Sequence, residues 1–269
     1  MEVFIIDTFT SEKCKGNPTA VFVSNEFLPY DKALALAHEY ALPVSAFIEC
    51  TQREQNVFPI RYFTPTQEIP ACGHATLAVV KVVADKFGIT EPCFKTTEGI
   101  LIKTQLKDDI ISMNYPKYEL KSCVVSKELL QALQIEQYRS AGICTELKAL
   151  FIELNDSKLL KTVEPDFIKL VKSSQVITEV VIHCLSDDNN YDFILRSFCP
   201  WIGIDEDPVT GSIHSILASY WQKRLNKNNL LVYQASDLGG EVLVTAFPDK
   251  VQIGGKTTVV SIKELTNSS

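Results

Sequence analysis

The stretch Arg61-Tyr62-Phe63-Thr64-Pro65 is followed closely by Pro70-Ala71-Cys72-Gly73-His74, which leads into an apolar helix. A second copy of this pattern reads Arg196-Ser197-Phe198-Cys199-Pro200 and then Pro208-Val209-Thr210-Gly211-Ser212. The first segments are 135 positions apart and the second segments 138. The shared pattern is R-x-F-x-P, a short loop, and P-x-x-G-[HS] at the start of a helix. Chance agreement is the alternative, but such repetition favours two similar domains related by a pseudo-two-fold axis.

The length agrees with a duplication, because 269 residues at about 150 per domain correspond to about 1.8 domains. The segment 115–126 contains Pro116 and a run of polar residues, so it is the expected linker. The predicted domains are therefore residues 1–117 and 118–269, with the last residues free to pack back on the first domain.

The composition indicates a small-molecule protein of the cytoplasm. The net charge of −7 argues against nucleic acid as a partner, since phosphate binding draws on clustered Lys and Arg. The start of the chain has no basic signal-peptide region, and no apolar run approaches the length of a membrane span, so we expect no membrane contact. The eight cysteines lie far apart and never form C-x-x-C, which favours reduced thiols over disulfides or a zinc site.

The two glycine-to-helix junctions are candidate anion sites. A helix N-terminus exposes unpaired backbone N–H groups with about half a positive charge, and a glycine lets an anion approach closely. Two such junctions facing one cleft between the domains could hold a small carboxylate. The alternative is that Gly73 and Gly211 only permit tight turns.

Three side chains at these junctions are candidates for a functional role. His74 lies at the expected helix start, where the helix dipole favours the neutral ring and hence proton transfer near pH 7. Asp207 is the ionisable residue at the corresponding place in the second half, and Ser212 is positioned to cap the helix expected over 212–225. The simpler alternatives are a surface histidine, a turn aspartate and a cap without ligand contact.

The sequence resembles the PhzF family, the phenazine-biosynthesis-like isomerases that share the diaminopimelate epimerase fold. The resemblance covers nearly the whole chain, and the interval 115–200 matches only in pattern. It is carried by the four motifs Gly16-Asn17-Pro18-Thr19-Ala20-Val21, Arg61-Tyr62-Phe63-Thr64-Pro65, Cys72-Gly73-His74-Ala75-Thr76-Leu77-Ala78 and Glu206-Asp207-Pro208-Val209-Thr210-Gly211-Ser212.

The resemblance implies an α+β fold of two similar domains, each a curled, mostly antiparallel sheet around a central helix. It also implies a cofactor-independent isomerase, a possible homodimer, and a substrate bound in the cleft between the domains. The founding activity of the family moves a proton between ring carbons of trans-2,3-dihydro-3-hydroxyanthranilate. By motif, His74 would relay or position the proton and Asp207 would contact polar groups of the substrate. The candidate substrate-binding residues are Asn17, Gly73, Thr210, Gly211 and Ser212.

One departure from the family concerns its general base. The family has a glutamate in a segment like N-L-S-E-T-A-F-V, whereas residues 41–48 read A-L-P-V-S-A-F-I and place Val44 at that position. Valine cannot carry a proton, and loss of a positioned acid or base typically costs about 10²- to 10⁴-fold in rate. No nearby acid is an obvious replacement, although Glu68 and Glu206 lie in the loops that lead to the two helices.

A second departure concerns thiol chemistry. Diaminopimelate epimerase uses two cysteines, one at each glycine junction, but this chain has Cys72 at the first junction and no cysteine in residues 207–210. A symmetric two-thiol racemase is therefore not expected, and Cys72 is interpreted as a packed thiol.

Two functions remain open from the sequence. One is an isomerase that acts on a small cyclic, amino or hydroxy carboxylate with a base other than the usual glutamate. The other is a catalytically lapsed family member that binds a small anion or a protein partner. An NAD- or phosphate-dependent enzyme is set aside, because the chain has neither G-x-G-x-x-G nor a Walker loop.

Overall fold

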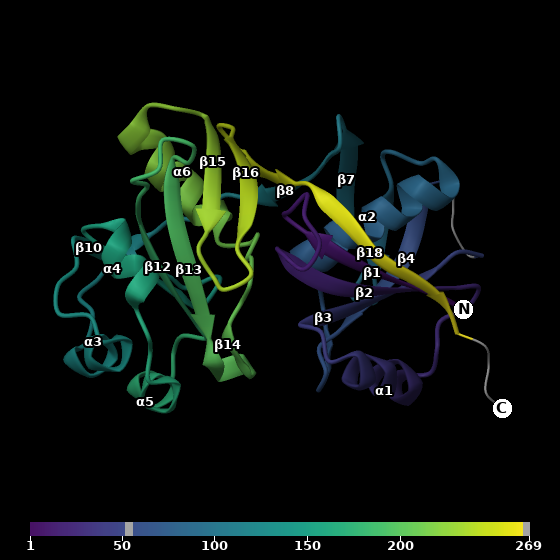
Figure 1. Ribbon diagram of the computed structural model, residues 1–269, viewed down its shortest axis with the longest axis horizontal. Coiled ribbons are helices and arrows are strands. Elements are labelled where there is room, and N and C mark those ends of the chain that lie inside the picture. The colour runs from purple at the N-terminus through teal and green to yellow at the C-terminus, as the bar shows by residue number, and fades with distance from the viewer. Residues whose placement is uncertain (52–55, 266–269) are drawn as a thin grey trace. The chain divides into compact units, whose positions relative to one another are not determined.

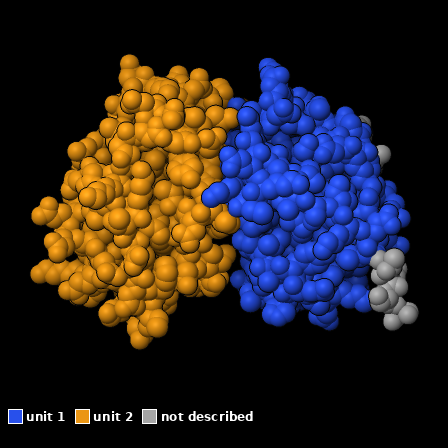
Figure 2. Space-filling view, viewed as in Figure 1, with its two compact units in different colours: residues 1–114, 252–269 blue, residues 115–251 orange. Residues whose placement is uncertain are grey.

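The computed structural model describes residues 1–51 and 56–265, so the last four residues of the predicted second domain lie outside the described residues. The chain forms two compact units (Figure 2): unit 1 is residues 1–114 with 252–269, and unit 2 is residues 115–251. The division expected after residue 117 falls a few residues inside unit 2. The C-terminal strand belongs to unit 1, because it pairs with the first strand of the chain.

Unit 1 is a mixed sheet that wraps around one helix, α2 (Figure 1). Its elements are β1 (Glu2–Thr8), β2 (Asn17–Ser24), α1 (Tyr30–Tyr40), β3 (Val44–Glu49), β4 (Val57–Phe63), β5 (Glu68–Ile69), α2 (Gly73–Phe87), β6 (Cys93–Thr96), β7 (Leu101–Lys107), β8 (Ile110–Pro116), β17 (Lys250–Gly255) and β18 (Thr257–Glu264), with β8 and β17 running across the division between the units. β1 pairs antiparallel with both β2 and β18, and β2 continues in parallel to β3. β3 and β4 are antiparallel, and β4 then pairs in parallel with β6.

Unit 2 has the same order of pairings. Its elements are β9 (Lys121–Ser122), α3 (Lys127–Leu133), β10 (Ser140–Cys144), β11 (Ala149–Glu153), α4 (Ser157–Thr162), α5 (Phe167–Ser173), β12 (Glu179–Leu185), β13 (Phe193–Cys199), η1 (Pro200–Ile202), β14 (Ile204–Glu206), α6 (His214–Leu225), β15 (Asn229–Gln234) and β16 (Gly240–Ala246). β10 and β11 are antiparallel, β11 and β12 parallel, β12 and β13 antiparallel, and β13 and β15 parallel. The predicted α+β fold of two similar, mostly antiparallel domains around central helices is confirmed.

The central helices are buried on nearly every side over their first turns, as expected for helices inside a curled sheet. In α2, His74–Val80, Val82 and Val83 are buried, and in α6, His214–Ala218 and Trp221 are buried. The other face of each sheet packs against further helices, with α1 covering unit 1 and α3, α4 and α5 covering unit 2. No helix within residues 1–51 and 56–265 is long and apolar enough to cross a membrane.

The two arginines of the repeat do the same structural work in each unit. Arg61 forms two hydrogen bonds of 2.8 Å with the carboxylate of Glu68, and Arg196 forms two of 2.8 and 2.7 Å with Glu206. Each guanidinium also lies 4.9 Å from the ring centroid of the phenylalanine two residues further along its strand. These paired Arg–Glu forks fix the short hairpins β4–β5 and β13–β14, which lead into the two central helices.

Candidate functional site

His74 is held at the start of α2, facing the polar end of β2. It is the second residue of the helix and only 8% exposed. The side-chain amide of Asn17 donates to His74 Nδ1 at 3.3 Å, and Cys72 Sγ lies 3.4 Å from the same nitrogen. Asn17 is anchored in turn, because Thr8 Oγ1 donates to its carbonyl oxygen at 3.0 Å. The structure therefore brings together Asn17 and His74 of the predicted site, with Cys72 packed beside them.

The ring of His74 is neutral at physiological pH. Burial lowers its pKa from 6.5 to about 3, because the charged ring would lose its hydration. The neutral form predicted from the sequence is thus present, with burial as its main cause. Since Nδ1 accepts from Asn17, the ring proton lies on Nε2, and the ring has one donor and one acceptor nitrogen.

The junction before α2 differs from an ordinary helix start. Cys72 is the N-cap residue in an extended conformation, and its side chain makes no capping hydrogen bond. The helix begins at Gly73, so His74 lies at the helix start, as expected from the sequence. Gly73 and His74 therefore occupy the first turn, where backbone N–H groups lack partners within the helix.

In unit 2, Asp207 lies in a tightly bonded loop between β14 and α6. Thr210 Oγ1 donates to Asp207 Oδ2 at 2.5 Å, and the Asp207 N–H donates to the carbonyl oxygen of Ser197 at 3.0 Å. This loop holds four of the predicted site residues, which are Asp207, Thr210, Gly211 and Ser212. The carboxylate is thus held in a defined position at the approach to α6.

Gln234 holds this loop from the end of β15 and was missed by the sequence analysis. Its side chain is fully buried, donates to the carbonyl oxygen of Asp207 at 2.7 Å and accepts from the Thr210 N–H at 2.8 Å. Ser236 adds a bond of 2.7 Å from its hydroxyl to the carbonyl oxygen of Pro208. The only signal in the sequence was a polar residue at the end of an otherwise apolar strand.

The predicted capping role of Ser212 is wrong. α6 begins at His214, its N-cap residue is Ile213, and no side chain caps it. Residues before it form a turn in which the Ser212 carbonyl oxygen accepts from the N–H and hydroxyl of Ser215. The Ser212 side chain is left without a capping function, which keeps it available as a candidate ligand contact.

Val44, which the family resemblance aligns with a glutamate, is the first residue of β3 and only 4% exposed. It pairs with Thr19 of β2, whose hydroxyl is buried and has no hydrogen-bond partner within the described residues. Unit 1 therefore places an apolar side chain beside the unsatisfied hydroxyl of Thr19. A buried polar atom without a hydrogen-bond partner is uncommon in proteins.

Glu179 is a second residue that the sequence did not single out. It is the first residue of β12 and only partly exposed, and Ser197 Oγ donates to its Oε1 at 2.5 Å. Burial raises its pKa to about 7, with the nearby charge of Asp207 adding to the rise and the Ser197 hydrogen bond opposing it. Its carboxyl thus changes charge in the physiological range.

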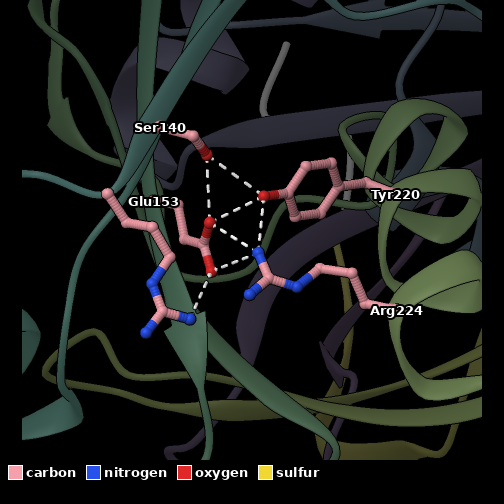
Figure 3. Close-up of polar contacts among 5 residues, drawn as sticks. Ser140, Glu153, Tyr220 and Arg224 are labelled. Atoms are coloured by element: carbon pink, nitrogen blue, oxygen red, sulfur yellow. Dashed lines mark hydrogen bonds and ion pairs between the residues drawn. The ribbon is translucent and has the colours of Figure 1, made fainter.

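A larger polar cluster in unit 2 is structural (Figure 3). Glu153 is 1% exposed and accepts hydrogen bonds from Ser140 Oγ at 3.0 Å, Tyr220 OH at 2.6 Å and Arg224 Nη1 at 2.7 Å. Burial opposes ionisation here, but the bonds from Tyr220 and Ser140 and the charge of Arg224 outweigh it and lower the pKa of Glu153. This saturated carboxylate ties α6 to β10 and β11.

Among the described residues, no group of three or more His, Cys, Asp and Glu side chains could hold a metal ion. All eight cysteines are free thiols, and burial raises the pKa of several, including Cys184 to about 12. The thiols with a raised pKa are protonated at neutral pH, which does not favour a nucleophilic role for them.

Two similar α+β halves, each a curled sheet around a central helix, define the epimerase-like fold. The family model for phenazine biosynthesis-like proteins, PhzC-PhzF, matches residues 6–263. The chain belongs to this family.

Individual relatives agree over their full lengths. The chain is 34% identical to a protein of Halalkalibacterium halodurans named as an uncharacterized isomerase, over 98% of this chain and 97% of that one. It is 31% identical to phenazine biosynthesis-like domain-containing protein 1 of Mus musculus, over 99% of both chains. A crystal structure of a PhzF family protein from Enterococcus faecalis is similar with a TM-score of 0.91, at 31% identity over 98% of both chains.

Proposed function

We propose that this protein is a cofactor-independent isomerase that moves a proton between carbon atoms of a small cyclic, amino or hydroxy carboxylate. The observation that carries the proposal is the neutral, nearly buried His74, oriented by Asn17 at the first turn of α2. A neutral imidazole with one donor and one acceptor nitrogen can relay a proton without an external cofactor. The naming of a full-length relative as an isomerase supports the same reaction class.

The carboxylate of the substrate would bind where backbone N–H groups are free. Gly73 is in the first turn of α2, and Gly211 and Ser212 form the turn before α6. Unpaired N–H groups with the positive end of the helix dipole favour a carboxylate. We propose that the substrate contacts both halves of the chain, as the family resemblance implies.

Asp207 would hold a polar group of the substrate. Its carboxylate is fixed by Thr210 and its backbone by Gln234, so it loses little further freedom when a hydroxyl or amino group binds to it. Thr210 serves this site by orienting Asp207, and Asn17 by orienting His74.

The direct test is hydrogen exchange in D₂O, followed by proton NMR. The probes are trans-2,3-dihydro-3-hydroxyanthranilate and a panel of α-amino and α-hydroxy acids. We expect a loss of C–H signal and isomerisation for at least one compound, and a loss of activity in Asp207→Asn. Absence of exchange with every probe would contradict the proposal.

The second candidate function is that of a family member that has lost catalysis. The one observation that favours it is Val44 at the position of the family glutamate. The substitution Val44→Glu tests it, because Thr19 offers a hydroxyl donor beside that position. If the unmodified protein is inactive and Val44→Glu isomerises trans-2,3-dihydro-3-hydroxyanthranilate, the protein has lapsed. Activity of the unmodified protein would exclude this alternative. The homodimer implied by the resemblance stays a prediction.

A further inference from the structure

The strand registers of the two units make Glu179 the counterpart of Val44. In unit 1, Ala46 pairs with Tyr62, and Val44 lies two residues before Ala46. In unit 2, Val181 pairs with Ser197, and Glu179 lies two residues before Val181.

The neighbouring parallel strands give the same correspondence. Val44 is opposite Thr19 in β2, and Glu179 is opposite Ala149 in β11. Each is the first pair of its parallel ladder, in agreement with the register of β3 with β4 and of β12 with β13, which places a carboxyl group in unit 2 where unit 1 has a valine.

The surroundings of Glu179 accommodate a carboxyl group. At the position of Tyr62 in unit 1, unit 2 has the small Ser197, which donates to Glu179 Oε1. Tyr62 instead bonds to Thr76 of α2 at 2.6 Å. Ser197 also accepts the Asp207 N–H through its carbonyl oxygen, so one residue bonds both to Glu179 and to the loop of the candidate site.

Glu179 differs from the structural carboxylate on the same pair of strands. Glu153 and Glu179 lie at opposite ends of the β11–β12 pairing, since Glu153 is opposite His183 and Ala149 is opposite Glu179. Glu153 has a cation and two hydroxyl donors, as Figure 3 shows, and it is saturated. Glu179 has one hydroxyl donor and a carboxylate neighbour, an arrangement that stabilises its charged form less than the surroundings of Glu153 do and is typical of a proton-carrying group.

We propose that Glu179, at the start of β12 beside the Asp207 loop, is the general base of this protein and does in unit 2 what Val44 cannot do in unit 1. This inference rests on the proposed isomerase function and assigns its base. A substrate C–H bond breaks, and an O–H bond forms on the Glu179 carboxylate. The electron pair of the C–H bond moves into the adjacent π system of the substrate. Return of the proton to another carbon breaks the O–H bond and forms the new C–H bond, so no oxidant or co-reactant is consumed.

The titration of Glu179 suits this role. Burial, with a smaller contribution from the charge of Asp207, raises its pKa to about 7 against the opposing hydrogen bond from Ser197. The other titratable group close to it is Cys199 at the end of β13, whose pKa is raised by burial and by the charges of Asp207 and Glu179. Cys199 is therefore a neutral thiol, and burial, more than the charge of Asp207, sets the affinity of Glu179 for its proton.

The experiment compares Glu179→Gln with Glu241→Gln in the D₂O exchange assay with the same probes. The amide oxygen of the introduced glutamine can still accept from Ser197, so the fold is kept while proton transfer is lost; circular dichroism checks the fold. Glu241 is an exposed residue of β16 that bonds to Tyr191, and it serves as the matched control. We expect a loss of about 10²- to 10⁴-fold in Glu179→Gln, partial activity in Glu179→Asp and an unchanged rate in Glu241→Gln.

The pH profile separates a base from a structural carboxyl. For the unmodified protein, kcat/KM should rise with pH through about 7, because the base must be deprotonated. Ser197→Ala removes a donor that stabilises the carboxylate, so this rise should move to higher pH. Exchange that persists at full rate in Glu179→Gln, or a rise unmoved by Ser197→Ala, overturns the assignment and leaves the isomerase standing. No exchange by the unmodified protein overturns the isomerase and, with it, the base.

Discussion

Unit 1 and unit 2 share a scaffold and differ in the polar groups that the scaffold holds. Both have the same order of strand pairings, a buried central helix and an Arg–Glu fork stacked on a phenylalanine. Around the central helices, unit 1 presents a neutral histidine and a valine, whereas unit 2 presents Asp207 and a second carboxyl group. The repeated positions maintain the fold, and the positions that differ between the halves are those to which we assign the chemistry in our proposal.

The largest expected effect is on His74, whose counterpart in the repeated P-x-x-G-[HS] motif is Ser212. We predict that His74→Ala lowers the exchange rate by about 10²- to 10⁴-fold, because the proton relay is lost. The measurement is deuterium incorporation by NMR under saturating substrate. His38→Ala, on the exposed side of α1, is the control and should leave the rate unchanged. Equal rates in His74→Ala and the unmodified protein would remove His74 from the mechanism.

An intermediate effect is expected where the units are alike. We predict that Arg61→Met and Arg196→Met each lower the free energy of unfolding by about 1.5–3 kcal/mol, because each leaves a mostly buried glutamate without its charged partner. Urea unfolding of both variants measures the loss. The exposed i,i+4 pair of Lys81 and Asp85 is the control, and Lys81→Met should cost no more than about 0.5 kcal/mol. A large loss in only one arginine variant would show that the forks are not equivalent.

The smallest expected effect concerns side-chain capping, which we compare at the starts of α6 and α3. Ser212→Ala should change the free energy of unfolding by less than about 0.5 kcal/mol, because Ser212 does not cap α6. Ser126→Ala, its matched control, should cost about 1 kcal/mol, because Ser126 Oγ accepts from the Leu129 N–H at the start of α3. If Ser212→Ala is as destabilising as Ser126→Ala, Ser212 has a capping role that the structure does not show.

Much of the fold could be predicted from the sequence because the repeat is built from local signals. Each R-x-F-x-P segment precedes a turn and an apolar helix, and both segments form their fork within a few residues of chain. His74, Asp207 and Thr210 were found for the same reason, since each lies at a recognisable junction between a turn and a helix.

The residues that were missed depend on contacts between distant segments. Gln234 reaches Asp207 and Thr210 only because β15 lies parallel to β13, and Glu179 is placed beside Ser197 by the pairing of β12 with β13. A single sequence does not give such registers. The position of Ser212 was misjudged for another reason: the chain makes a turn over residues 211–213 before α6 begins.

The pairing of β1 with β18 joins strands that are far apart in the sequence and bears on how unit 1 is made. β1 is synthesised before β18, so unit 1 lacks one of its strands until β18 has left the ribosome. Unit 2 lies between them and can fold earlier. During that interval the outer edge of β1 has no partner, and an unpaired strand edge promotes association with other chains. The edge of β1 is therefore where the nascent protein most needs chaperone protection.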